Sequence, residues 1–126
     1  MSEDTGVTPQ GASLEGKNLI LAVSGGIAAT ESIKLARELR RHGANVFPMM
    51  SKSAEKVISP LALSWGSGVE VVTDWDPKMS QLSGFDGLIL APATRNTIAK
   101  FSHGLIDSPM MMALSAAVGS DIPTLF

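Results

Sequence analysis

The sequence predicts a single α/β domain in three layers, a parallel sheet of the Rossmann-like (flavodoxin-like) type with helices on both faces. Continuous apolar runs of strand length occur at Leu19–Val23 and Gly87–Ala91, as is typical of strands whose two faces are both covered. Helical spacing follows the first run, with Ile33, Ala36 and Leu39 on one face. Alternation of such strands and helices along a chain produces a parallel sheet.

Composition limits the classes of function. The chain has 126 residues, 44% hydrophobic and 17% charged, which is enough for a core of its own. A net charge of −2 without a basic cluster disfavours nucleic acid as a partner. The chain has no cysteine, which excludes disulfides, zinc–thiolate sites and cysteine nucleophiles, and we expect no metal. No apolar run is long enough for a membrane span and no signal-peptide pattern opens the chain, so we expect a cytoplasmic protein without a membrane partner.

The two ends of the chain differ from the middle. Residues 1–16 are polar and rich in Gly, Ser and Thr, which predicts a disordered leader or a cloning remnant before a domain at residues 17–126. Ile122–Phe126 indicates the start of a fifth strand, where the sequence stops.

A Gly-Gly turn leads from the first strand into the first long helix. Ser24, Gly25 and Gly26 form this turn, and the helix is expected to end at His42–Gly43. Glycine lets a backbone approach a ligand closely, and a helix start offers unpaired N–H groups at the positive end of the helix dipole. These features favour a phosphate ligand, although a plain tight turn would show the same residues.

Two more loops of hydrogen-bonding residues follow predicted strands. Ser51–Ser53 follows a strand at Asn45–Met50, and Pro92–Thr97 follows the run that ends at Ala91. Because ligands of parallel α/β sheets bind outside the carboxyl ends of the strands, we expect the loops and the Gly-Gly turn to form one crevice. The acidic residue and the longer glycine fingerprint of NAD-binding proteins are absent, which favours a mononucleotide. Ser51 or Ser53 could also cap a helix.

The remaining elements are less regular. We expect a helix at Ala54–Trp65 that is broken at Pro60, a short strand at Val69–Val72, and helices at about 97–101 and 108–118. The inward-facing residues of the broken helix are expected to be Val57, Ile58, Leu61 and Leu63. Three consecutive helical residues cannot all face one core, so the run Met110, Met111 and Met112 is interpreted as core plus subunit interface, with ligand contact as the alternative.

The loop Ala91–Lys100 and the following His103–Asp107, together with Ser24–Ala29 and Ser51–Ser53, resemble the flavin-containing cysteine decarboxylase family. The resemblance covers about residues 17–126 and is nearest to the phosphopantothenoylcysteine decarboxylase type. It rests mainly on a Pro-x-Ser/Thr-x-Asn-Thr element and the Gly-x-x-Asp after it. Members of the family continue past this terminus into a substrate clamp, which implies that the domain is truncated at its C-terminal end or that the remainder is on another chain. The resemblance implies FMN as the cofactor and a homo-oligomer built on trimers. The implied FMN-binding residues are Ser24, Gly25, Gly26, Ser51, Ser53, Thr94, Arg95, Asn96 and Thr97.

One departure from the family concerns catalysis. Decarboxylases of the family carry a histidine in the connection after the third strand, and the alignment places Gln81 there, which has no titratable proton. The catalytic residues thus stay unidentified, and we expect flavin redox chemistry with a small substrate or an electron-transfer partner, as in a related dihydromethanopterin reductase. The alternatives are a phosphopantothenoylcysteine decarboxylase of coenzyme A biosynthesis and a non-catalytic flavin-binding regulatory subunit.

Overall fold

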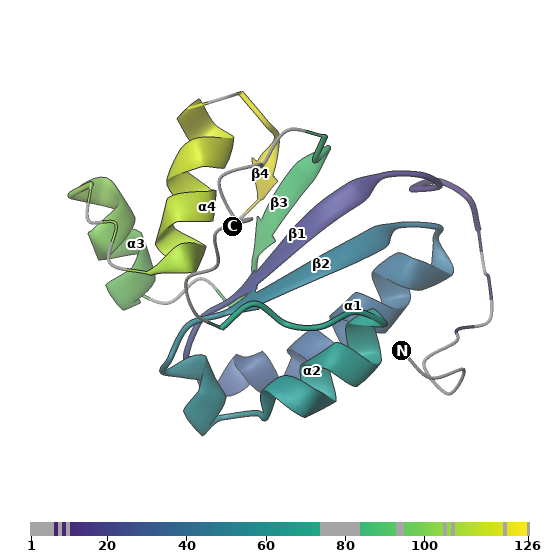
Figure 1. Ribbon diagram of the computed structural model, residues 1–126, viewed down its shortest axis with the longest axis horizontal. Helices are drawn as coiled ribbons and strands as arrows, with labels where there is room; N and C mark the ends of the chain where they lie inside the picture. The colour runs from purple at the N-terminus through teal and green to yellow at the C-terminus, as the bar shows by residue number, and fades with distance from the viewer. Residues whose placement is uncertain are drawn as a thin grey trace.

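A parallel sheet of four strands forms the centre of the molecule in the computed structural model (Figure 1). The structure describes residues 7, 9, 11–73, 84–92, 95–104, 106, 108–119 and 121–125, with the backbone alone at 95, 96, 100 and 101. The strands lie in the order β2-β1-β3-β4 and every pair is parallel. Their bounds are β1 Asn18–Val23, β2 Asn45–Met50, β3 Gly87–Leu90 and β4 Thr124–Leu125.

Helices cover both faces of this sheet, which confirms the predicted three-layer α/β fold. The helices α1 and α2 lie on one face and α4 lies on the other, with α3 beside α4 (Figure 1). The α-helices are α1 Ser32–Arg41, α2 Pro60–Ser67, α3 Arg95–Ser102 and α4 Pro109–Gly119, and the short 3-10 helices are η2 Ile27–Glu31 and η3 Ala54–Lys56.

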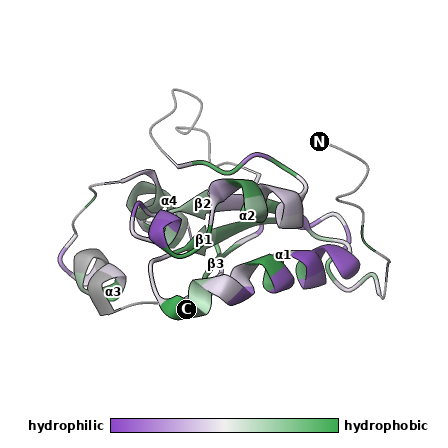
Figure 2. Ribbon diagram, turned by 90° about the horizontal axis from the view of Figure 1, so that it is seen from below, coloured by the Kyte–Doolittle hydropathy of each residue, from purple (hydrophilic) through white to green (hydrophobic). Residues whose placement is uncertain are grey.

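The apolar run of β1 serves two cores. Ile20 and Ala22 pack with α4, whereas Leu21 and Val23 pack with α1 and α2, and none of the four is more than 2% exposed. Successive side chains of a strand point to opposite faces, so a strand covered on both sides needs apolar residues at every position. Figure 2 shows the resulting contrast between the hydrophobic strands and α1, which carries hydrophilic residues along its length.

The methionine run lies in the core on the α4 face. Met110 and Met111 are 2% and 1% exposed. Met112 is half-buried and packs against the same cluster, so all three residues contact one core. The core part of the expectation is confirmed, and the role of the run at a subunit interface stays a prediction, since Met112 keeps an exposed part.

Pro60 begins α2 instead of interrupting a longer helix. Its missing N–H is harmless in a first turn, and the Ser59 hydroxyl caps the helix by accepting a hydrogen bond from the Ala62 N–H at 3.0 Å. Leu63 is fully buried as expected, but Leu61 is 78% exposed. Two residues apart on a helix point in roughly opposite directions, so a helix that buries Leu63 must expose Leu61.

The short strand predicted at Val69–Val72 is reduced to one bridge between Val72 and Met49. The Val72 N–H donates to the Pro48 carbonyl, and the Met50 N–H donates to the Val72 carbonyl, both at 3.0 Å. Pro48 has no N–H to donate toward this segment, so the ladder does not extend further. The bridge still places this segment outside β2, on the side of the sheet opposite β3.

Two boundaries, the start of the domain and the start of α3, lie earlier in the chain than predicted. The segment before residue 17 is attached to the domain where the structure describes it, because the Leu14 N–H donates to the His42 carbonyl at 2.8 Å and Leu14 packs against the core. The helix expected at about 97–101 begins earlier, at Arg95. The polar loop after β3 is therefore shorter than predicted.

Candidate cofactor site

Three loops leave the sheet at the carboxyl ends of neighbouring strands. The Ser51 N–H donates to the Val23 carbonyl, and the Ala91 N–H donates to the Ala22 carbonyl, each at 3.0 Å. The loops after β2 and β3 thus begin as hydrogen-bonded continuations of the sheet on either side of β1. The chain passes from β1 to β2 in one direction and to β3 in the other, which makes this edge a topological switch point where α/β proteins bind ligands.

The first loop touches the second at Gly25. A Cβ atom on Gly25 would lie 2.6 Å from the Ser53 Cβ and 2.9 Å from the Ser53 carbonyl carbon, closer than real Cβ atoms come. Glycine is needed here for close approach of two backbones. The turn at Gly25 is consequently pressed against the loop that carries Ser51 and Ser53.

The two serines of the second loop have different surroundings. The Ser51 hydroxyl accepts a hydrogen bond from the Ala54 N–H at 3.2 Å and so caps the turn η3, the role considered for either serine. The Ser53 side chain makes no such capping bond and is exposed. Their hydroxyl oxygens lie 3.1 Å apart. Either hydroxyl can be the donor of this hydrogen bond, so one hydroxyl proton beside the Gly25 backbone stays available for an anion.

Ser24 connects the first loop to the third. The residue is 1% exposed, and its hydroxyl donates to the carbonyl oxygen of Pro92. Sequence reasoning missed the part played by Pro92, and no signal in the sequence could have shown it, because every residue carries a carbonyl group. The Ser24 side chain therefore lies between two loops.

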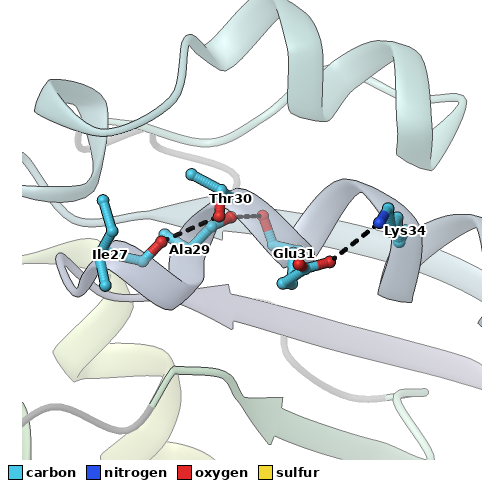
Figure 3. A network of polar contacts seen from close by, with 6 residues as sticks. Ile27, Ala29, Thr30, Glu31 and Lys34 are labelled. Atoms are coloured by element: carbon cyan, nitrogen blue, oxygen red, sulfur yellow. Dashed lines mark hydrogen bonds and ion pairs between the residues drawn. The ribbon is translucent and has the colours of Figure 1, made fainter.

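A 3-10 helix, η2, stands between the glycines and α1, where one continuous α-helix was expected. Gly26 precedes it in an extended conformation. Within η2 the Thr30 hydroxyl donates to the Ile27 carbonyl at 3.0 Å, and an exposed ion pair at 3.5 Å joins Glu31 to Lys34 of α1 (Figure 3). The N–H groups of a first helical turn have no partner within the helix.

The other predicted site residues are placed less fully. Arg95 and Asn96 begin α3, and Thr97 is buried in the first turn of that helix at 6% exposure. Thr94 and Gln81 lie outside the described residues, so the assignment of Gln81 to the histidine position stays a prediction.

The donor set of the three loops fits a phosphate group. The described residues at the loop starts contribute hydroxyl and backbone N–H groups, and the cation Lys52 lies between the two serines with Glu55 3.6 Å away. Among the residues that the structure describes, no group of three His, Cys, Asp or Glu could hold a metal ion. Within that same part of the chain, none of the helices has both the length and the apolar character to cross a membrane.

The fold places this chain in the doubly wound α/β class, whose members bind ligands at the edge just described. Within that class the chain belongs to the Flavoprotein family, whose family model matches residues 7–126. The resemblance to flavin-containing cysteine decarboxylases is thereby confirmed, and so is the expectation of a flavin cofactor.

Similar sequences are proteins of coenzyme A biosynthesis. The bifunctional protein CoaBC of Thermococcus kodakarensis is 41% identical over 111 residues, which are 82% of this chain and 28% of that protein. The CoaBC protein of Methanocaldococcus jannaschii is 38% identical over 98 residues, 75% of this chain and 24% of that protein. The chain thus spans about a quarter of the length of these relatives.

Similar solved structures share the fold. The FMN-dependent cysteine decarboxylase TvaF from thioviridamide biosynthesis matches with a TM-score of 0.77 at 21% identity, covering 86% of this chain and 70% of TvaF. AnUbiX (PadA1), solved in complex with FMN and dimethylallyl pyrophosphate, also matches with a TM-score of 0.77, at 23% identity over 86% of this chain and 62% of that one.

These relatives correct the function expected from the sequence. The preference for a redox enzyme of the dihydromethanopterin reductase type is wrong, because the relatives are named for coenzyme A biosynthesis. That preference rested on glutamine instead of histidine at position 81. A single side chain outweighed the similarity of the whole domain in that reasoning, and the similarity is the stronger guide.

Proposed function

We propose that this chain binds FMN and decarboxylates phosphopantothenoylcysteine, a step of coenzyme A biosynthesis. The observation that carries the proposal is the convergence of the first loop with both of its neighbours, through Gly25 against Ser53 and Ser24 on Pro92. The relatives in coenzyme A biosynthesis support the choice of substrate, and FMN-dependent cysteine decarboxylases of the same fold support the cofactor. Such a metabolic role favours the cytoplasm as the location.

The phosphate of FMN would be held where the first and second loops meet. The hydroxyls of Ser51 and Ser53 and the backbone of Gly25 and Gly26 lie at this place. Hydrogen bonds to a charged phosphate are stronger than those between neutral groups, so a few such donors suffice to select a phosphorylated flavin. Arg95, Asn96 and Thr97, on the first turn of α3, would follow the rest of the cofactor away from the phosphate.

FMN held beside Gly25, Ser51 and Ser53 would supply a reversible two-electron acceptor for the thiol side of the substrate cysteine, and the net change would replace the carboxylate by hydrogen. The residues of the chain would bind the cofactor and fix its orientation. Packing of Gly25 on Ser53 fixes the phosphate end, and the hydrogen bond from Ser24 fixes the start of the loop after β3.

The test is carbon dioxide release by the purified protein loaded with FMN. With phosphopantothenoylcysteine, we expect carbon dioxide and phosphopantetheine in equal amounts, with no external oxidant consumed. The matched control is the serine analogue, which has the same carboxylate but no thiol and should release none. Equal release from both substrates, or no release from the cysteine substrate by flavin-loaded protein, would contradict the proposal.

We also propose that the protein assembles as a homo-oligomer built on trimers. Ile27 and Leu61 are 83% and 78% exposed, which is unusual for large aliphatic side chains at the starts of two helices. A UbiX-like decarboxylase from Escherichia coli O157:H7, which shares the fold with a TM-score of 0.75 at 21% identity, is described as dodecameric. Burial of such side chains between subunits would remove apolar surface from water.

A further inference from the structure

We propose that Ser24 is a positioning residue that sets the spacing between the phosphate end and the flavin end of the cofactor site, without touching the cofactor. The proposal rests on the proposed function and concerns the same site. It differs from the direct contact with FMN that the sequence resemblance implies for Ser24.

Three successive residues at the end of β1 contact the two neighbouring loops alternately. The Val23 carbonyl accepts the Ser51 N–H at 3.0 Å, the Ser24 hydroxyl donates to the Pro92 carbonyl, and the Gly25 backbone packs against Ser53. The end of β1 and the first loop therefore contact the second loop through Val23 and Gly25. The Ser24 side chain makes the contact with the third loop. The two residues joined by this hydrogen bond, Ser24 and Pro92, are 68 positions apart in the sequence.

Burial and hydrogen-bond capacity argue against direct binding by Ser24. The residue is 1% exposed, so its hydroxyl points into the protein. A serine hydroxyl has one proton to donate, and here the Pro92 carbonyl accepts it. A phosphate dianion needs donors, and this hydroxyl has none left to offer. Ser53, by contrast, is exposed beside Gly25.

The position of Pro92 affects the rest of the site because α3 begins three residues later, at Arg95. The predicted cofactor residues of this segment, Arg95, Asn96 and Thr97, stand on the first turn of that helix. A shift of the Pro92 carbonyl would move this turn relative to the phosphate end. Ser24 thus sets a distance between two groups of residues that bind different parts of one cofactor.

The experiment compares FMN with riboflavin, which lacks the phosphate, in the whole protein freed of flavin. Dissociation constants of both are measured for the wild type, Ser24→Ala, Ser53→Ala and the control Ser32→Ala. Ser32 is a matched control because it is 3% exposed and its hydroxyl donates to the Ala29 carbonyl at 2.6 Å, within one helical segment. The visible circular dichroism of the bound flavin is recorded for each variant.

For Ser24→Ala we expect the affinities for FMN and riboflavin to fall by the same factor, about five- to tenfold, with the flavin dichroism altered. For Ser53→Ala we expect about a ten- to hundredfold loss for FMN alone, so that the preference for FMN over riboflavin collapses. Ser32→Ala should leave both affinities and the dichroism unchanged, even if it lowers the melting temperature.

A collapse of the FMN preference in Ser24→Ala, as in Ser53→Ala, would show a direct phosphate contact and overturn the proposal. Unchanged affinities in a folded Ser24→Ala protein would overturn it as well. If Ser24→Ala does not fold, Ser24→Cys keeps a side chain of the same connectivity, slightly larger and with a weaker donor, and the same equal loss for both ligands is expected. A wild type that binds neither flavin would instead refute the proposed function, and this inference with it.

Discussion

Arg37 on α1 places its guanidinium carbon 4.3 Å from the centre of the Trp65 ring on α2. A cation over an aromatic face at this distance is attracted by the electrons of the ring. The pair joins the two helices that cover one face of the sheet, at a position where Trp65 is still 42% exposed. Helix packing on this face therefore includes a polar contact at its rim.

A double-mutant cycle measures this contact. We expect Arg37→Ala and Trp65→Leu to be coupled by about 0.5–1 kcal/mol in the free energy of unfolding, the range for a partly exposed cation–π pair. Urea denaturation of the wild type, both single variants and the double variant gives the value. Strictly additive effects would show that the ring and the guanidinium are neighbours without an interaction.

Gly25 should not tolerate a side chain. In Gly25→Ala the new methyl would lie 2.6 Å from the Ser53 Cβ, so the two loops must move apart and FMN affinity should fall by about tenfold or more. Gly119→Ala is the matched control, because nothing lies within 4 Å of its added Cβ and alanine favours a helix. Flavin titration measures both. An unchanged affinity in Gly25→Ala would contradict the close contact between the loops.

Ser59 should contribute to stability but not to flavin binding. Its hydroxyl accepts the Ala62 N–H at the start of α2, and loss of such a cap costs about 1 kcal/mol. We expect Ser59→Ala to lower the urea midpoint and leave the FMN dissociation constant unchanged. Ser59→Asp, which restores an acceptor at the cap, should recover most of the loss; a failure to recover would point to a different cause.

The degree of assembly should depend on Leu61. Substitution of Leu61 by Glu places a charge where an apolar contact between subunits is proposed, so the assembly should dissociate toward monomers in light scattering. Lys52→Glu, a charge change at another exposed residue, should leave the assembly intact. A wild type that is monomeric at all concentrations would exclude the oligomer.

Acid pH should weaken the end of α1 through Glu38. The hydrogen bond from Arg41 at 2.9 Å is the main reason that the pKa of Glu38 lies below its ordinary value of 4.5. A carboxyl whose pKa is lower in the folded than in the unfolded state stabilises the protein at pH values above the unfolded-state pKa. This contribution is lost as the pH falls through the folded-state pKa. Carboxyl titration by NMR should show the pKa of Glu38 rising toward 4.5 in Arg41→Gln. No rise would mean that the exposed bond is not populated in solution.

The sequence predicted the strands of the sheet centre well because β1 is apolar at every position from Leu19 to Val23, a pattern typical of a strand covered on both faces. A whole strand was predicted at Val69–Val72, where the structure has a single bridge. The composition of this segment says nothing about the missing N–H of its neighbour Pro48, which ends the ladder. Leu61 was predicted to face inward because a longer helix broken at Pro60 was expected. The helix instead begins at Pro60, and burial of Leu63 then leaves Leu61 exposed. The error at Val72 thus came from a residue distant in sequence, whereas the error at Leu61 came from the local start of the helix.

The candidate site was predictable as a set of loops but not as a set of contacts. Parallel strands bring Ser24, Ser51 and Pro92 to one edge by topology alone. Two contacts depend on distances between loops that no local sequence pattern encodes. One is the close approach of Gly25 to Ser53, which leaves no room for a side chain on Gly25, and the other is the hydrogen bond from the Ser24 hydroxyl to the Pro92 carbonyl. The choice between redox and decarboxylase chemistry failed for a related reason, since it weighted one aligned residue above the whole domain.

The continuation of the strand ladder into Ser51 and Ala91 has a thermodynamic consequence. Fixing the backbone of one residue costs about 1–2 kcal/mol of conformational entropy, and a flexible loop meets that cost only when its ligand arrives. Here the first residue of each loop is already immobilised by the sheet when the chain folds. Flavin binding at this edge should therefore carry a small entropic penalty, and the loop starts should keep their shape until the whole domain melts.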